Sequence, residues 1–157
     1  MLTYLTGESL AQLIEEACPG AVKGWKRSDL WVAPESVLDV SKYVSAAPDL
    51  KFDLLNSISA VDYIDHFEII YHLTSTSENL SIVLKAKVYG RDNPALPSVV
   101  SIWQGADFQE REIWDLMGVT FQGHPNLKRI MLWDGYEGHP LRRDYWSHQD
   151  RLKYVIK

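Results

Sequence analysis

The stretch HFEIIYHLTSTSENLSIVLKAKVYG, from His66 to Gly90, decides the fold of this chain. It contains two runs in which apolar residues recur at every second position, the spacing of β-strands with one buried face. The polar segment Ser75–Asn79 separates the two runs and predicts a hairpin loop. The positions expected on the buried face are Phe67, Ile69, Tyr71 and Leu73 in the first run and Leu80, Ile82, Leu84, Ala86 and Val88 in the second.

The segments that precede this hairpin add strands and helices. Phe52–Tyr63 is expected to be a further strand, and Ala21–Val32 a strand interrupted by Ser28 and Asp29. Glu8–Ala17 has apolar residues at helical spacing, and a second helix is predicted to begin at Pro34 and to end before Pro48. Since the strands after residue 50 follow one another without intervening helices, we expect an α+β fold with two layers. An antiparallel or mixed sheet would carry helices on one face, within a domain of residues 1–118.

Composition excludes several classes of protein. The chain has 157 residues, enough for one domain with a core, and its net charge of −5 gives no overall electrostatic attraction for nucleic acid. Its single cysteine, Cys18, allows neither an internal disulfide nor a cysteine cluster for a metal. The sequence shows no basic leader and no apolar run of the ~20 residues that a membrane span needs, so we expect a soluble chain.

Residues 119–157 have little periodicity, two prolines, three glycines and many arginines, and four of the six tryptophans lie in the last third of the chain. About forty residues without clear elements are unusual inside a compact domain. Aromatic residues and arginines are enriched in protein–protein interfaces. We therefore predict that residues 119–157 form an extended, irregular C-terminal arm that packs on a partner protein.

A predicted helix between Gly105 and Gly118 mixes charged and apolar residues. On a helical wheel, Arg111, Glu112 and Asp115 fall on one polar face, whereas Glu110 lies within the apolar arc. The charged residues are compatible with a solvated face, where Arg111 and Asp115 would form an i,i+4 pair, or with a surface for a partner. A carboxylate at Glu110 needs a partner, and arginines of the arm supply candidates in Arg129, Arg142 and Arg143.

Catalytic and metal-binding interpretations are weaker. Glu110 and Glu112 point in different directions on a helix and cannot share a substrate, and no nucleophile–base pair is evident. His124, His139 and His148 with Asp134 and Asp144 lack the close spacing of metal-ligand motifs. No glycine-rich phosphate loop is present. We predict no catalytic, cofactor-binding or metal-ligating residue in this chain.

Three stretches resemble the C subunit (the 30-kilodalton-type subunit) of respiratory NADH-quinone oxidoreductase, complex I, in order and spacing. They are SAVDYIDHFEIIYHL, VYGRDNPALPSVVSIWQGADFQEREIWDLMGV and FQGHPNLKRIMLWDGYEGHPLRRDY. The resemblance extends roughly from Leu50 to Trp146. It implies that the following residues form the structural signature and the interface with a partner: Glu110, Arg111, Glu112, Asp115, His124, Pro125, Lys128, Arg129, Arg142, Arg143 and Asp144.

The resemblance implies a non-catalytic structural subunit in the peripheral arm of a proton-translocating complex. It holds no cofactor itself, although the host complex is expected to use NADH, flavin, iron–sulfur clusters and quinone. Its implied partners are the D subunit, which contributes to the quinone site, and the B subunit. We expect a peripheral location on the cytoplasmic face of the cell membrane. The alternatives are the equivalent subunit of an energy-converting hydrogenase or of a deazaflavin-dependent dehydrogenase, or a free-standing protein-binding module.

Overall fold

The computed structural model describes residues 3–145. A six-stranded mixed sheet has the order β2-β3-β6-β5-β4, with β1 also paired to β6. The strands of this sheet are β1 (Thr3–Tyr4), β2 (Val22–Lys26), β3 (Asp29–Val32), β4 (Leu54–Asp62), β5 (His66–Ser75) and β6 (Leu80–Tyr89). The helices are α1 (Gly7–Ala17), the short 3-10 turn η1 (Pro34–Ser36), α2 (Val37–Ala46) and α3 (Ala106–Met117), and β7 (Ala95–Pro97) pairs with β8 (Thr120–Gln122) in a second small parallel sheet.

The central hairpin forms as predicted. β5 pairs antiparallel with β6 in continuous register from His66–Tyr89 to Ser75–Leu80. β4 pairs antiparallel with β5, which confirms the third strand, whereas β3 and β1 run parallel to β6 and make the sheet mixed. The segment expected to be one interrupted strand is instead the β2–β3 hairpin, because the chain reverses between Lys26 and Asp29.

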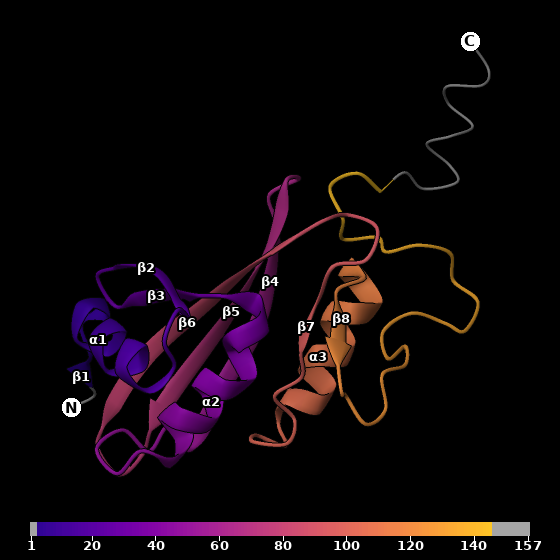
Figure 1. Ribbon diagram of the computed structural model, residues 1–157. Helices are drawn as coiled ribbons and strands as arrows, with labels where there is room; N and C mark the ends of the chain where they lie inside the picture. Colours follow the sequence, from indigo (N-terminus) through magenta and orange to yellow (C-terminus); the bar gives the residue numbers. More distant parts are fainter. Residues whose placement is uncertain (1–2, 146–157) are drawn as a thin grey trace.

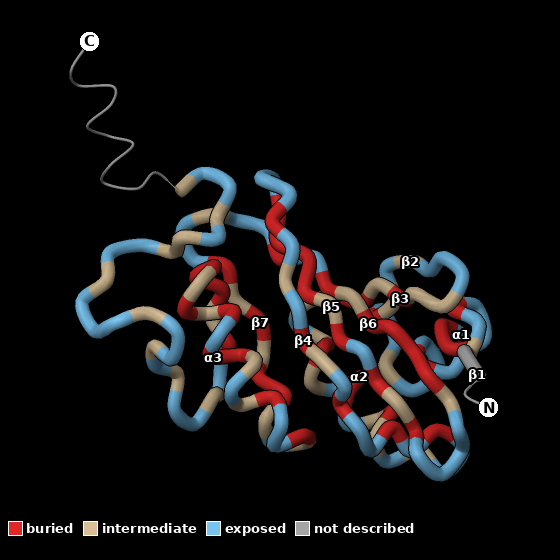
Figure 2. The backbone as a smooth tube through the Cα atoms, turned by 180° about the vertical axis from the view of Figure 1, so that it is seen from behind, coloured by how far each residue is buried: buried red, intermediate tan, exposed pale blue. Residues whose placement is uncertain are grey.

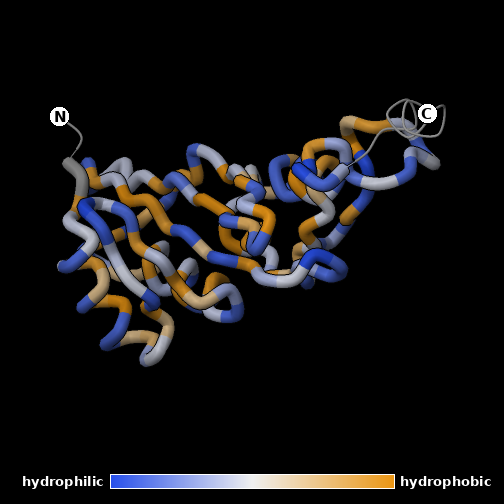
Figure 3. The backbone as a smooth tube through the Cα atoms, turned by 90° about the horizontal axis from the view of Figure 1, so that it is seen from above, coloured by the Kyte–Doolittle hydropathy of each residue, from blue (hydrophilic) through white to orange (hydrophobic). Residues whose placement is uncertain are grey.

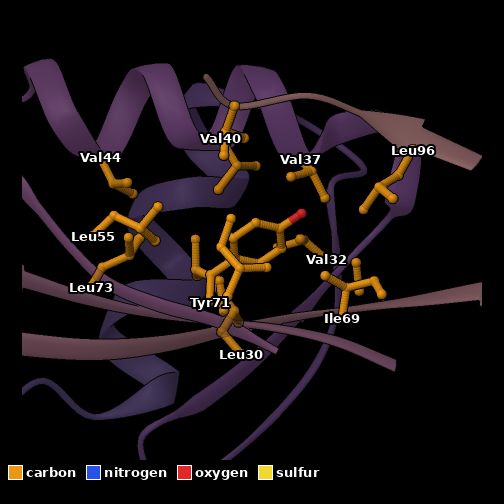
Figure 4. Close-up of a cluster of buried hydrophobic side chains, with 14 of the residues drawn as sticks. Leu30, Val32, Val37, Val40, Val44, Leu55, Ile69, Tyr71, Leu73 and Leu96 are labelled. Carbon is orange, nitrogen blue, oxygen red and sulfur yellow. The ribbon is translucent and has the colours of Figure 1, made fainter. Parts of the chain in front are cut away.

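The main core lies between the inner face of the sheet and α1 and α2 (Figures 1 and 4). Leu10 and Ile14 of α1 and Val40 of α2 are fully buried, and Figure 4 shows α2 placing its valines over Tyr71 and Leu73 of β5. Thr6 starts α1 because its hydroxyl accepts the Ser9 amide. The α+β class and the helical cover on one face are thus confirmed.

Helix α3 lies beside β4, the edge strand, together with β7 and β8 (Figure 1). The amide of Ile58 on this edge donates to the Gln109 side chain at 2.6 Å, so α3 satisfies part of the open strand edge. Trp103, Met117 and Phe121 join α3 and β8 to the common core. Figure 2 shows α3 largely buried, whereas the chain after β8 is mostly exposed.

The arm predicted for residues 119–157 begins with a short strand rather than irregular chain. Val119 and Phe121 are buried, and β8 continues into turns without regular secondary structure up to residue 145. Residues 146–157 of the predicted arm lie outside the described residues. No helix in the described part of the chain is long and apolar enough to cross a membrane.

Candidate functional site

The residues singled out from the sequence gather where helix α3 meets the arm, in three polar networks. The first surrounds Asp115, whose side chain is fully buried. Its Oδ2 accepts the backbone amides of Ile130, Met131 and Leu132 at 2.8–3.0 Å, and its Oδ1 accepts Arg129 Nη1 at 2.5 Å. Burial alone raises the pKa of Asp115, but these hydrogen bonds outweigh it and hold the pKa at about 2.

Arg129 and Arg111 complete this first network. Arg129 also donates from Nη2 to the Tyr136 carbonyl at 2.6 Å, which ties two turns of the arm together. Arg111, nearly buried, donates to the carbonyls of Lys128 and Arg129 at 3.2 and 3.3 Å. Of the interpretations left open for these charges, the solvated Arg111–Asp115 pair is therefore wrong. Both side chains point at the arm, whose backbone covers this face of the helix.

The second network surrounds Glu110, which is buried as predicted but contacts no arginine of residues 3–145. Its Oε2 accepts the Ser98 hydroxyl at 2.6 Å and its Oε1 accepts the Val99 amide at 2.8 Å. The predicted Glu110–arginine pair is wrong because residues 98 and 99, which precede α3, occupy the position assigned to the arm. Burial raises the pKa of Glu110 to about 7 despite these two hydrogen bonds.

His124 connects this buried carboxylate to the arm. Its ring is fully buried, and Nε2 lies 4.0 Å from Glu110 Oε2 and 3.2 Å from the Asp107 carbonyl oxygen. Its Nδ1 accepts the Asn126 amide, which leaves the proton on Nε2 to be donated to Asp107. His124 thus fixes the turn after β8 against the first turns of α3.

The third network joins the distal part of the arm to the end of the sheet. Asp62 accepts hydrogen bonds from the two terminal nitrogens of the Arg91 guanidinium, at 2.6 and 3.0 Å, and also from the Arg143 amide at 2.9 Å. Burial raises the pKa of Asp62, but the hydrogen bonds of Arg91, Arg143 and Ile64 lower it to about 2. Arg91 also pairs with Asp144, so one arginine bridges the sheet and the arm.

Arg142 caps the C-terminal end of helix α3. It donates to the carbonyls of Met117, Arg91 and Gly118 at 2.6, 2.9 and 3.3 Å, and its guanidinium lies 5.3 Å from the Phe67 ring centre. Gly118 ends the helix with a φ of 71°, and a Cβ there would collide with His139 and Arg142. His139 and Arg142 of the arm therefore pack directly against the backbone at the C-terminal end of α3.

Four of the signature residues make no such buried contact with their side chains. Glu112, Pro125, Lys128 and Arg143 are exposed. Beside them, the arm and α3 expose large apolar side chains at Phe108 (62%), Met131 (61%), Trp133 (69%) and Leu141 (58%). Figure 3 shows hydrophobic stretches in the arm as well as in the domain. The outer surface of this region is suited to a second protein.

Sequence reasoning missed Asp62, Arg91 and Ser98, and it considered His139 only as a metal ligand. His139 donates from Nδ1 to the Asp115 carbonyl at 2.9 Å, and burial lowers its pKa. A signal for Asp62 and Arg91 was present, since one ends β4 and the other follows β6, and these parallel-running strands finish at the same end of the sheet. Among the described residues, no group of three or more His, Cys, Asp or Glu could hold a metal ion, and His148 lies outside them.

Comparisons with known proteins agree with the resemblance in the sequence. Residues 30–151 match the family model described as the respiratory-chain NADH dehydrogenase 30 Kd subunit. The NADH-quinone oxidoreductase C subunit of Roseiflexus sp. (strain RS-1) is 38% identical over 147 residues, covering 89% of this chain and 84% of the relative. The C 2 subunit of the enzyme from Rhizobium meliloti (strain 1021) is 37% identical over 126 residues, covering 77% and 68%.

Among solved structures, a chain of the membrane-bound sulfane sulfur reductase, an archaeal respiratory membrane complex, has the same fold. It superposes with a TM-score of 0.73 at 24% identity and covers 96% of this chain and 92% of its own length. The segment matched by the family model contains all three polar networks described above. The chain therefore belongs to the family of the 30-kilodalton subunit, also named the C subunit, of respiratory-chain NADH dehydrogenase.

Proposed function

We propose that this chain is a non-catalytic structural subunit in the peripheral arm of a proton-translocating NADH-quinone oxidoreductase. It docks through its C-terminal arm on the quinone-site subunit, the D subunit, and lies near the B subunit. NADH, flavin, iron–sulfur clusters and quinone belong to other subunits of the host complex. The chain is peripheral, at the cytoplasmic face of the membrane.

One observation carries the docking proposal. Beyond β8 the arm is anchored to the domain by buried polar contacts, while Met131, Trp133 and Leu141 are exposed. Asp115 and Arg129 hold the backbone of residues 130–132, yet Met131 and Trp133 in and beside this loop are exposed by 61% and 69%. Exposed apolar residues on a fixed backbone are typical of interface anchors, because little conformational entropy is lost on binding.

The host is assigned to the NADH-quinone oxidoreductases because the relatives that carry that name are 34–40% identical to this chain. A structural role is supported by the way the titratable residues of the site are used. Asp115, Asp62 and Glu110 each bind backbone amides of this chain, so their carboxylates serve its own loops rather than a substrate.

Affinity purification from detergent-solubilised membranes tests the proposal. The tagged wild-type chain should recover the D and B subunits, and a photo-cross-linking residue at position 131 should label the quinone-site subunit. Changing Met131→Ala and Trp133→Ala together should lower the recovery of this partner about tenfold or more, since two interface anchors each contribute above about 1 kcal/mol. Leu54→Ala, at a residue 44% exposed on β4, is the control and should recover wild-type amounts.

Two results would contradict the proposal. Recovery of the wild-type chain without any other subunit would exclude membership of a complex. If the double variant recovered as much of the quinone-site subunit as the wild-type chain, the exposed apolar residues of the arm would not be the docking surface.

A further inference from the structure

The outer face of the large sheet, opposite α1 and α2, has a hollow lined by charged and aromatic side chains. Along β5 and β6 the side chains that point away from the core include Glu68, Lys85 and Lys87, and β3 adds Asp29 and Trp31. These residues line a hollow of about 710 Å³. We define this hollow, with the turn between β2 and β3 that borders it, as the outer-face groove.

The floor of the outer-face groove is held rigid by paired groups. The Trp31 indole Nε1 donates to Glu68 Oε2 at 2.8 Å, which satisfies a carboxylate that is only 6% exposed. Lys85 Nζ lies 4.9 Å from the Trp31 ring centre and 2.6 Å from Asp29 Oδ2. Lys85 faces two carboxylates, Asp29 and Glu68, so these contacts fix the floor and leave one negative charge on it. Because the rim adds three cations, the lining of the groove as a whole stays net positive.

The rim carries cations that remain available. Lys26, Arg27 and Lys87 are exposed and line the groove. No carboxylate of the described residues lies within ion-pair distance of these three side chains. Unpaired cations gathered around one hollow attract a negatively charged partner.

An aromatic wall stands at one end of the groove. His66 is stacked on Tyr63 with ring centres 5.0 Å apart, and the ring centre of Tyr89 lies 5.4 Å from that of His66. Beyond Lys87 a second, more apolar hollow of about 840 Å³ is lined by Trp25, Trp31 and Tyr89 among others. Trp31 and Lys87 line both hollows, so the two hollows adjoin one another.

The charge of this face contrasts with that of the rest of the domain. The chain has a net charge of −5, and helices α1 and α2 on the opposite face carry four carboxylates, Glu8, Glu15, Glu16 and Asp39, against one lysine, Lys42. The positive rim therefore stands out on an acidic protein. A flat anionic membrane surface fits a concave groove poorly, whereas a protruding polypeptide fits it.

We propose that the outer-face groove binds an acidic segment, with aspartate or glutamate beside apolar residues, from another subunit of the host complex. This inference rests on the proposed function and adds an interface separate from the arm. Carboxylates of the segment pair with Lys26, Arg27 and Lys87, and its apolar side chains lie against Trp31 and Tyr89.

Lysine reactivity in the intact complex tests this interface. An N-hydroxysuccinimide acetate reagent is applied to the isolated chain and to the purified complex, and acetylation is followed by mass spectrometry. Lys26 and Lys87 should react about tenfold more slowly in the complex. Lys42, on the opposite face with its side chain 58% exposed, is the control and should react at similar rates in both. A carbodiimide should link Lys26 or Lys87 to a carboxylate of another subunit.

A variant pair extends the test at two exposed residues. Since Lys26 and Lys87 lie opposite Asp29 and Glu68 in the sheet, where a glutamate places like charges together, thermal unfolding of the variant must first show that it is folded. Lys26→Glu with Lys87→Glu should reduce the retention of the chain in the complex at 0.15 M salt about tenfold, whereas Lys42→Glu should retain wild-type behaviour. If the chain recovers its complex but Lys26 and Lys87 react as fast there as in the isolated chain, the groove is not an interface and only this inference fails. If the wild-type chain recovers no other subunit, the proposed function fails and this inference with it. Binding of the isolated chain to phosphatidylserine vesicles that is lost in Lys26→Glu/Lys87→Glu would assign the groove to lipid and overturn the protein partner.

Discussion

Replacing Asp115 by asparagine alters the anchor of the arm by little more than one atom and one charge. In the wild-type protein Oδ2 faces three backbone amides and Oδ1 faces the Arg129 guanidinium, so every group around the carboxylate is a donor. An asparagine has one oxygen and one amino group. In either orientation of the asparagine side chain, its NH2 group faces a hydrogen-bond donor: either the three backbone amides or the Arg129 guanidinium.

The expected loss can be bounded from the structure. The shift of the Asp115 pKa from 3.8 to about 2 means that the folded arm stabilises the charged form by about 2 kcal/mol. Removing one member of a buried pair costs about 3–5 kcal/mol, because its partner stays buried without compensation. Since asparagine keeps one acceptor, we expect a loss of about 3 kcal/mol in the stability of the arm–helix junction.

Native-state hydrogen exchange measures this loss locally. The amides of residues 130–132, which bind Asp115, should exchange about a hundredfold faster in Asp115→Asn at pH 7, whereas the β5 amides keep their protection. Glu112→Gln, an exposed change on the same helix, should leave all these amides unaffected. The depressed pKa places this contribution above pH ~4, and it is lost as the pH falls towards 2, where wild type and Asp115→Asn should converge. An acceleration of less than about tenfold at pH 7 would refute the reasoning.

Two further predictions concern the other networks. The raised pKa of Glu110, from 4.5 to about 7, means that its contribution to stability is complete below pH ~4.5 and is lost as the pH rises through 7. The free energy of urea unfolding of wild type, relative to Glu110→Gln, should therefore fall by about 3 kcal/mol between pH 4.5 and 8.5; a pH-independent difference would exclude a protonated Glu110. Gly118→Ala should cost about 2 kcal/mol or more, because a left-handed backbone and a collision with His139 and Arg142 act together. Gly135→Ala, with a φ of 86° and open space for a Cβ, should cost only about 1 kcal/mol, and equal losses in thermal unfolding would show that the arm does not press on Gly118.

The sheet was predictable because one of its faces packs against the core and the other faces away from it. The alternation from Phe67 to Leu73 directly reports which side chains meet the core, and all four inward residues are nearly or fully buried. The β2–β3 hairpin was less accessible to sequence reasoning. Its reversal at Arg27 uses a φ of 57°, a conformation that the local sequence, without a glycine at this position, does not announce.

The polar face of α3 was wrongly predicted to be solvated. A helical wheel gives the direction in which each side chain points, but not which other segment of the chain covers that face. Arg111 and Asp115 point away from the apolar core, and that much was correct. What the wheel cannot show is that residues 128–132 return over this face and bring backbone amides and carbonyls to it. Glu110 shows the converse, since its burial followed from the wheel, while its partners, Ser98 and Val99, come from the chain before the helix.

The junction between the arm and helix α3 depends on polar rather than apolar contacts, and this choice has a physical reason. An arm held by apolar packing would consume the side chains that a partner needs, and apolar contacts tolerate sliding because they have no direction. Hydrogen bonds to backbone amides fix direction and register, and Asp115, Asp62 and His124 each bind at least one amide of the arm. The arm thus acquires its path from buried polar groups at the junction, and Met131, Trp133 and Leu141 stay exposed on that path. For this reason, changes in the polar networks should move the arm and weaken docking while the sheet remains folded, and changes in the exposed apolar residues should weaken docking while the arm stays in place.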